Sequence, residues 1–364
     1  MRKKAYFKSV TIFLSILLVF SQLQLFSLPA YGETVSDQPL LFRSVGVAQN
    51  GTTYYVDGEG GNNANDGQSP ASAWRDFEKV NQTEFQPGDH LLLNAQSTWN
   101  NQLLHPKGNG TAAQKIVIDF YDTNDKGETI FETTRRPIIN GGGTYSTGTF
   151  KRAISGAVQL VNQEYWDISN LEVTNTPELD NLEGYKKPGD AQRAGILVLG
   201  YEQNRTFNSV TIRNNYVHDV QTEYYLNLSG NTATKRLKAV GGIIVLGSWF
   251  DENGNVVTAA NDHRTTTGFN DILIENNVIQ RMGLEGIRTK ADSDTSRGNT
   301  FYKTFSNITI RNNYLEDIAG DGIVLSESKS GGVVEGNVAV RMCNADYGTQ
   351  NYAGEIGRAS CRER

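Results

Sequence analysis

Four charged residues in the second half of the chain have the types and spacing that chemistry on a sugar requires. Glu285, Arg288 and Lys290 lie in one short segment, and Asp321 occupies the matching place in the next repeat. In a lyase that acts on a uronic acid, Arg288 would neutralise the sugar carboxylate and Lys290 would abstract the neighbouring proton. Glu285 and Asp321 would then bind a calcium ion or orient the two cations.

The same residues fit two other interpretations. Carboxyl groups about 5 Å apart suit a retaining glycoside hydrolase, in which one group is the acid/base and the other the nucleophile, and adjacent repeats supply roughly that separation. A structural alternative is an ion-pair patch in which Glu285 pairs with Arg288 and Lys290 pairs with Asp292. Spacing alone leaves the choice open.

Internal repeats are the elements that must position these residues. A motif with two central asparagines recurs, with a looser last copy, at 212–217, 274–279, 310–315 and 334–339. A short apolar strand that begins with glycine lies near the first three copies, at 242–245, 286–289 and 322–325. Two short strands per repeat, turned by Asn and Gly, predict one rung of a parallel β-solenoid.

Stacked rungs turn equivalent positions into columns, with a step of about 4.8 Å from rung to rung. One predicted column is a buried asparagine ladder, structural rather than catalytic: Asn215, Asn277, Asn313 and Asn337. A second brings two carboxylates onto adjacent rungs: Ala194, Gly241, Glu285, Asp321 and Ala353. A third is an alternating charge ladder, which we also interpret as structural: Asp219, Arg281, Asp317 and Arg341.

Side-chain alternation along a strand predicts which residues are accessible. Ile287 and Thr289 should face the core, whereas Arg288 and Lys290 should face solvent. The outward columns beside these cations contain uncharged residues: Leu197, Ile244 and Val324, then Leu199, Leu246 and Ser326. One rung would thus display two cations, flanked by carboxylates, on an otherwise uncharged sheet face.

The order of motifs from Tyr54 onward resembles the secreted right-handed parallel β-helix proteins of the pectin-lyase-like superfamily. The features that carry this resemblance are a first strand at 54–56, a turn at Asp66-Gly67, a capping segment at 74–80, the triplet 87–89 and the Asn-rich rungs to 354. It implies an all-β fold, a single-stranded right-handed parallel β-helix with loop insertions. The superfamily includes lyases, hydrolases, esterases and adhesins, so the fold does not select an activity. The motif sets of polygalacturonases and of common pectate lyases are absent from the sequence.

The two ends of the sequence have a composition unlike the repeats. Basic residues followed by an apolar run and small residues predict a signal peptide over 1–32, with a linker over 33–53. An uncleaved membrane anchor is the weaker alternative, because polar Gln22 and Gln24 interrupt the apolar run. Residues 54–354 would form the helix, incomplete at its C-terminus, and 355–364 resemble a translated sequencing adapter. Cys343 and Cys361 supply no disulfide framework.

Composition narrows the class of partner. The 364 residues include 37 Gly and 8 Pro, and the net charge of -6 has no basic stripe, which argues against nucleic acid. Loops at 221–240 and 248–269 would wall a groove, where Tyr224, Tyr225 and Trp249 could stack on sugar rings. We expect a monomer with a polysaccharide substrate, no membrane contact after signal cleavage, and no certain cofactor beyond a possible Ca²⁺. His218 and His263 are lesser candidates for a base.

Taken together, the sequence predicts a secreted, carbohydrate-active β-helix protein. We favour a lyase that cleaves an acidic polysaccharide by β-elimination, with Lys290, Arg288, Glu285 and Asp321 at its site. A retaining glycoside hydrolase is the alternative enzyme, and a non-catalytic binding or adhesion solenoid is the alternative outside enzymes.

Overall fold

The computed structural model describes residues 41–143, 153–176, 191–202, 205–221, 240–247, 267–291, 304–326 and 328–342. The chain divides into two units after Leu40, and every described residue belongs to the second unit. The predicted signal peptide therefore lies outside the described residues, as do Cys343 and the C-terminal segment. No helix in the described ranges is both long and apolar enough to span a membrane.

Three large sheets form the described unit. The ten-stranded sheet contains β2 (Thr53–Val56), β4 (His90–Asn94), β7 (Ile116–Thr123), β12 (Trp166–Ser169), β15 (Thr206–Arg213), β18 (Gly268–Glu275), β21 (Phe305–Arg311) and β24 (Ser328–Ser330), with β25 (Val333–Glu335) on β21 and β8 (Thr129–Ile130) on β7. The seven-stranded sheet contains β5 (Thr98–Asn100), β10 (Ile138–Asn140), β13 (Glu172–Asn175), β16 (Tyr216–Val220), β19 (Val278–Met282), β22 (Tyr314–Ile318) and β26 (Val338–Met342). The five-stranded sheet contains β11 (Ala153–Val161), β14 (Ala191–Gly200), β17 (Gly241–Gly247), β20 (Glu285–Ala291) and β23 (Ile323–Leu325).

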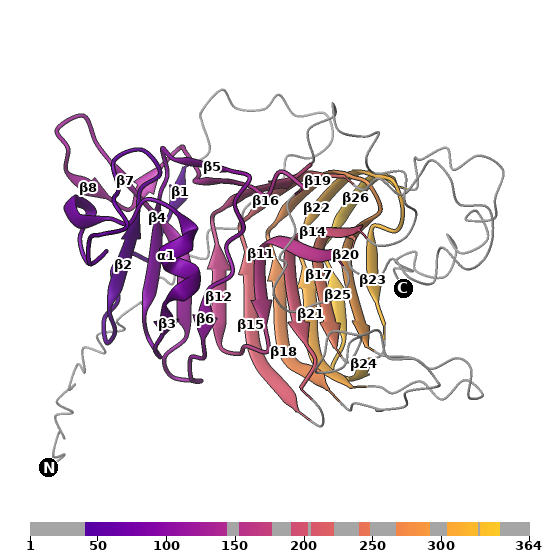
Figure 1. The fold of residues 1–364 in the computed structure, drawn as a ribbon. Helices are drawn as coiled ribbons and strands as arrows, with labels where there is room; N and C mark the ends of the chain where they lie inside the picture. The colour runs from indigo at the N-terminus through magenta and orange to yellow at the C-terminus, as the bar shows by residue number, and fades with distance from the viewer. Residues whose placement is uncertain are drawn as a thin grey trace, which may run out of the picture. The chain divides into compact units, whose positions relative to one another are not determined.

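The chain visits the three sheets in turn and then repeats the circuit. Strands β18, β19 and β20 make one rung, and β21, β22 and β23 pair with them in parallel as the next rung. Figure 1 shows the successive rungs side by side, from indigo strands to yellow ones. This topology confirms the predicted all-β parallel solenoid, and with it the resemblance to parallel β-helix proteins at the level of fold.

A two-residue turn joins β15, β18, β21 and β25 of the ten-stranded sheet to β16, β19, β22 and β26 of the seven-stranded sheet. Its first residue is left-handed, with φ of 56° at Asn214 and at Asn276, a conformation that asparagine tolerates better than most residues. Its second residue belongs to the ladder: the Asn215 amide donates to Asn277 Oδ1 at 3.1 Å, and the Asn277 amide donates to Asn313 Oδ1 at 3.0 Å. The predicted asparagine ladder is confirmed, and it continues to Asn337.

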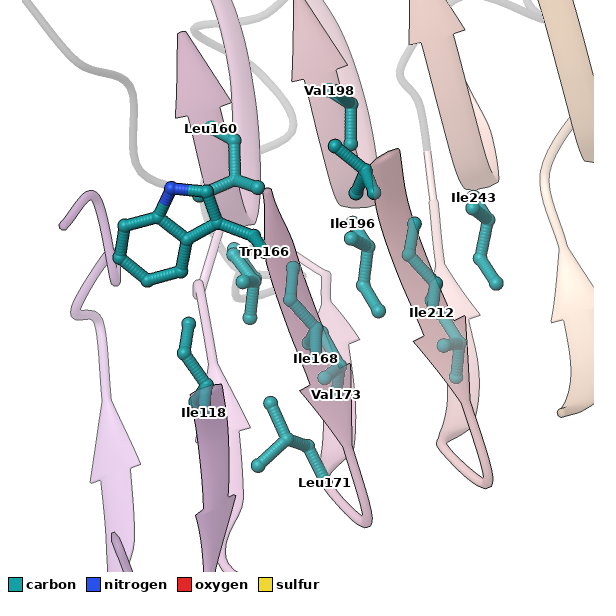
Figure 2. Packing of buried hydrophobic residues seen from close by; sticks show 14 of the residues in the cluster. Ile118, Leu160, Trp166, Ile168, Leu171, Val173, Ile196, Val198, Ile212 and Ile243 are labelled. Atoms are coloured by element: carbon teal, nitrogen blue, oxygen red, sulfur yellow. The ribbon is translucent and has the colours of Figure 1, made fainter. Parts of the chain in front are cut away.

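Apolar columns fill the space between the three sheets. Ile118, Ile168 and Ile212 are in register on β7, β12 and β15, and all three are fully buried. Figure 2 shows these side chains among those of Trp166, Leu171 and Ile196. A stack of Phe207, Phe269 and Phe305, with ring centroids 5.5 and 5.8 Å apart, forms another column of the same core. Since each side chain packs on its counterpart one rung away, the burial of any rung depends on its neighbours.

Four short elements lie among the first rungs of the solenoid. Helix α1 (Phe77–Gln82) has Asp76 as its N-cap and buries Phe77 and Val80. It overlaps the predicted capping segment at 74–80 and ends two residues beyond it. A 3₁₀ turn (Pro70–Ser72) precedes it, and β3 (Glu84–Phe85) pairs with β6 (Lys107–Gly108) beyond it.

Residues 42–53, which the sequence analysis assigns to a linker, also contact the helix. Strand β1 (Phe42–Arg43) pairs with β9 (Glu132–Thr133), and the guanidinium carbon of Arg136 lies 3.8 Å from the Phe42 ring centroid. The Val45 amide donates to the buried carboxylate of Asp119 at 2.9 Å. These contacts join segments far apart in the chain, so no local pattern in the sequence predicts them.

Two charge ladders run along the outside. The predicted one is confirmed: Arg281 contacts Asp219 at 2.7 Å, and Arg341 contacts Asp317 at 2.6 Å. All four residues have positive φ, between 50° and 56°, so the same uncommon backbone conformation recurs at this position on each of the four rungs. The second ladder, unpredicted, lies on the ten-stranded sheet, where Arg213, Glu275, Arg311 and Glu335 are in register.

We predict that Asn277→Ala lowers the free energy of unfolding by about 3 kcal/mol, because it leaves the buried Asn215 backbone N–H and neighbouring amides without partners. The matched control is Asn270→Ala, in the half-exposed ladder of Asn208, Asn270 and Asn307, where water replaces the lost bonds and the change stays under about 1 kcal/mol. Urea unfolding followed by circular dichroism measures both. Equal losses would contradict a special role for the buried ladder.

Candidate functional site

The predicted carboxylate column exists on the five-stranded sheet. Glu285 is in register with Gly241 on β17, and Gly241 is in register with Ala194 on β14. On the other side, the Gly286 amide donates to the Asp321 carbonyl at 2.9 Å, and Ile287 pairs with Ile323. Glu285 and Asp321 therefore occupy equivalent positions on adjacent rungs, as the alignment of the Gly-Ile strands predicted.

The side chains of β20 alternate between the two faces of the sheet as predicted, but the outward side chains are less exposed to solvent than predicted. Ile287 belongs to the main core, and Arg288 lies on the opposite face in register with Ile244 and Val324. The Arg288 side chain is only 8% exposed and that of Glu285 6% exposed, so the prediction that Arg288 faces solvent was wrong. Lys290, which was also expected to face solvent, is half-buried.

The outward face of this sheet explains the burial. It carries a second apolar cluster, whose members are all buried: Ala194, Leu197, Leu199, Ile244 and Leu246. These outward residues were expected to form a solvent-facing surface, and that expectation is wrong. A face built from leucine and isoleucine stabilises the protein only when it is covered, so it behaves as a second core.

A single guanidinium group joins the two carboxylates on this face. Arg288 Nη2 bonds Glu285 Oε1 within β20, and the same nitrogen lies 3.7 Å from Asp321 Oδ2 on the next rung. The Asp321 side chain is 30% exposed, far more than the other two. The ion pair between Glu285 and Arg288 that we considered as a structural alternative is therefore present, and it extends to Asp321.

This arrangement changes what Arg288 can do. Its charge is neutralised inside the protein, so it is not available as the substrate clamp that the lyase interpretation required. A buried ion pair loses much solvation, and its attraction offsets that loss only when the remaining hydrogen bonds are made. Charged groups held at such a cost in an apolar environment are candidates for function.

Several predicted residues lie outside the described residues. These are Tyr224, Tyr225, Trp249, His263, Asp292 and Ala353. Their roles stay predictions, as does the role of Lys290 as a base. Within the described ranges, His, Cys, Asp and Glu nowhere gather in a group of three or more that could hold a metal ion.

His218 belongs to the seven-stranded sheet and not to this site. Its Nδ1 lies 2.6 Å from Asp219 Oδ2, and its Nε2 lies 3.1 Å from Glu172 Oε1. Burial favours the neutral imidazole, but the hydrogen bonds to Glu172 and Asp219 outweigh it and raise the pKa of His218. A histidine held between two carboxylates is better suited to structure than to proton abstraction.

Sequence reasoning missed a buried arginine beside the carboxylate column. Arg193 immediately precedes Ala194 and is fully buried, and its Nε donates to the Gly143 carbonyl at 3.2 Å. The Gly143 amide in turn donates to Asn175 Oδ1 at 3.1 Å. The feature of the sequence that could have indicated this contact is the glycine triplet 141–143. Position 142 requires glycine, because a Cβ there would lie 1.8 Å from a side-chain oxygen of Asn101.

Comparison with known proteins adds a chemical context. No family model matches the chain. The chain is 27% identical over 318 residues to a lacto-N-biosidase of Bifidobacterium longum subsp. longum, a match that covers 77% of this chain and 19% of the relative, so the chain spans about a fifth of that protein.

Among solved structures, the GH136 lacto-N-biosidase from Eubacterium ramulus is 20% identical with a TM-score of 0.46, covering 79% of this chain and 56% of that one. A rhamnogalacturonan lyase is 14% identical with a TM-score of 0.32, covering 80% and 62%.

We predict that Arg288→Met lowers the free energy of unfolding by about 3 to 5 kcal/mol, because Glu285 would remain buried without its cation. Adding Glu285→Gln should recover most of that loss. Arg281→Met is the control: it removes an arginine of the preceding strand whose ion pair with Asp219 is largely exposed, so its cost should be about 0 to 1 kcal/mol. A double variant no more stable than Arg288→Met would refute this account.

We also predict a pH-dependent contribution from His218. Because its folded pKa is raised, the stabilisation is fully present below the unfolded value of about 6.5 and disappears as the pH rises through the folded value. His218→Gln should therefore destabilise the protein more in mildly acidic buffer than in alkaline buffer. Gln280→Ala, which alters the next residue of the same column without removing a titrating group, should cost the same at both pH values. Denaturation midpoints at two pH values test this.

Proposed function

We propose that this protein is a secreted, carbohydrate-degrading enzyme and that it acts as a glycoside hydrolase. The observation that carries the proposal is the pair of carboxylates on adjacent rungs, Glu285 and Asp321, joined by the buried guanidinium of Arg288. The similarity to a lacto-N-biosidase over most of the chain supports it. The proposal that the protein is secreted rests on the predicted signal peptide at 1–32 and on the expectation that the oligosaccharide substrate is extracellular.

Rung spacing suggests the stereochemistry. Adjacent strands of a sheet lie about 4.8 Å apart. Retaining glycosidases hold their two carboxyl groups about 5 to 5.5 Å apart, whereas inverting enzymes need a wider gap that admits a water molecule. Two side chains in one column on neighbouring strands therefore favour retention of the anomeric configuration.

The contacts of Arg288 also explain why hydrolysis fits better than elimination. A lyase at this site would need an uncompensated cation to bind the uronate carboxylate of its substrate. Arg288 instead contacts two carboxylates of the protein, so its positive charge is already compensated. A site of this kind suits a neutral sugar, whose reaction develops positive charge on the ring rather than a carbanion beside a carboxylate.

The choice of first substrate comes from the relative. Its name identifies an enzyme that acts on lacto-N-biose units, so we propose oligosaccharides that contain this unit as the substrate class to test.

The experiment uses para-nitrophenyl lacto-N-bioside and a lacto-N-biose-containing oligosaccharide. We expect the enzyme to release nitrophenol and a disaccharide. Proton NMR should show that the first-formed anomer of the disaccharide retains the configuration of the substrate. Asp321→Asn should abolish this activity. Asp317→Asn is the matched control, since Asp317 belongs to the same rung but pairs with Arg341 on the seven-stranded sheet. Uronate polysaccharides are assayed in parallel by ultraviolet absorbance. An unsaturated uronate product would establish a lyase instead, and inactivity on all substrates with retained sugar binding would favour a binding solenoid.

A further inference from the structure

Residues 42–48, here called the strap, cross three neighbouring strands of the ten-stranded sheet. The side-chain amide of Asn170, just after β12, donates to the Arg43 carbonyl at 3.0 Å. Towards the other end of the strap, His90 Nδ1 on β4 lies 2.7 Å from the Gly46 carbonyl oxygen. Between these two points the strap passes over β7, the strand that separates β4 from β12 in the sheet.

The residue beneath the centre of the strap is Asp119 of β7, whose side chain is fully buried. The backbone amide of Val45 in the strap donates to Asp119 Oδ2 at 2.9 Å, and the Asn170 side-chain amide donates to Oδ1 at 2.9 Å. Asn170 therefore holds the strap and the carboxyl group at once. Because the preceding residue, Ile118, belongs to the main core, Asp119 points to the outer face of the sheet, where the strap covers it.

We propose that the strap is a pH-sensitive closure, which is held most firmly when Asp119 is protonated and loosens when this carboxyl group ionises. An ionised carboxylate beneath the strap has lost contact with water, and this loss is costly. When the strap lifts, water reaches the carboxyl group and removes that cost. The proposal does not rest on the proposed function, because its contacts lie on the ten-stranded sheet and not at the candidate site.

The pKa of Asp119 gives the direction of this coupling. Burial raises the pKa to about 6, although hydrogen bonds from Asn170, Val45 and Phe120 act in the opposite sense. Once the strap lifts, the pKa should return towards the ordinary value of about 4. The closed form thus binds the proton more tightly than the open form. The stabilisation of the closed form is therefore fully present below about pH 4 and is lost as the pH rises through about 6.

Two charged groups of the sheet act on Asp119 itself. Asp167 on β12 raises the pKa of Asp119 further by charge repulsion, while its own charge is paired with Arg213 at 2.8 Å. The guanidinium of Arg136 attracts the carboxylate, and its carbon lies 3.8 Å from the ring centroid of Phe42 in the strap. Burial lowers the pKa of Arg136 only to about 10, so this group keeps its charge over the range in which Asp119 titrates.

Two titratable groups contact the strap away from Asp119. Glu132 pairs with Arg43 at 3.0 Å on the exposed surface, and its protonation in acid would loosen the strap, which is the opposite of the expected effect. His90 acts in the same direction as Asp119, because a protonated imidazole donates more strongly to the Gly46 carbonyl. The experiment must therefore separate Asp119 from His90.

Hydrogen–deuterium exchange of the full chain measures the opening of the strap. The readout is the protection factor of the Val45 backbone amide, corrected for the intrinsic effect of pH on exchange. From about pH 5 to about pH 7.5 we expect this protection to fall about tenfold, the change implied by pKa values of about 6 closed and about 4 open. The Ile212 amide in β15 is the internal control, since a parallel fall there would mean that the whole helix loosens and would contradict a local closure.

Three variants identify the group that takes up the proton. Asp119→Asn keeps the size of the side chain and an acceptor for the Val45 amide but cannot ionise, so protection should be nearly the same at both pH values. His90→Gln is the matched control and should keep the tenfold fall. Phe42→Ala removes the ring that packs on Arg136 and should lower protection by a similar factor at both pH values. A pH dependence that persists in Asp119→Asn, or that vanishes in His90→Gln, would overturn the proposal.

Carbon NMR of labelled aspartate carboxyl groups tests the same coupling in the wild-type protein, and so it remains decisive if Asp119→Asn fails to fold. The Asp119 signal should titrate with a midpoint near pH 6. A midpoint at the ordinary value of about 4 would show that the closed strap does not favour the protonated form, and would refute the proposal. Neither measurement involves a sugar, so the result is independent of whether the protein proves to be a glycoside hydrolase.

Discussion

The register between rungs depends on the asparagine amides at the corner between the ten- and seven-stranded sheets. Each amide in the ladder accepts from the backbone N–H and the amide of one neighbour and donates both to the next amide and to a backbone carbonyl. A slip of one residue in any strand would exchange its two faces. The ladder resists such a slip because every buried amide would lose all its partners together, and so it holds Ile287 inward and Arg288 outward.

The fixed register has a second effect. It aligns equivalent residues of successive rungs in columns, and along many rungs the residues of one column have the same chemical character. The seven- and ten-stranded sheets carry alternating charges, which neutralise one another at the surface. The five-stranded sheet is different: its outward columns are leucine and isoleucine on β14 and β17, and they become charged at β20. That change of character within one column marks the candidate site more clearly than any single residue does.

Much of the fold was predictable from residues that repeat. Asn215, Asn277 and Asn313 occur in near-identical hexapeptides, so their ladder, the strand pairs around it and the alignment of Glu285 with Asp321 followed from counting. The burial of Arg288 did not follow, because periodicity gives the direction of a side chain but not what lies over it. The contact of Phe42 with Arg136 was equally hidden, since neither residue belongs to a repeat.

The ladder hydrogen bonds also keep the geometry of the solenoid independent of the number of residues between successive rungs. The same amide-to-amide bond, 3.1, 3.0 and 2.9 Å long, closes intervals of 62, 36 and 24 residues. The entropy of closing a flexible loop grows only with the logarithm of its length, so the longest interval costs about 0.8 kcal/mol more than the shortest. Insertions between rungs are thus nearly neutral for stability. A scaffold of this kind can acquire longer loops between its rungs while the geometry of Glu285, Arg288 and Asp321 stays unchanged.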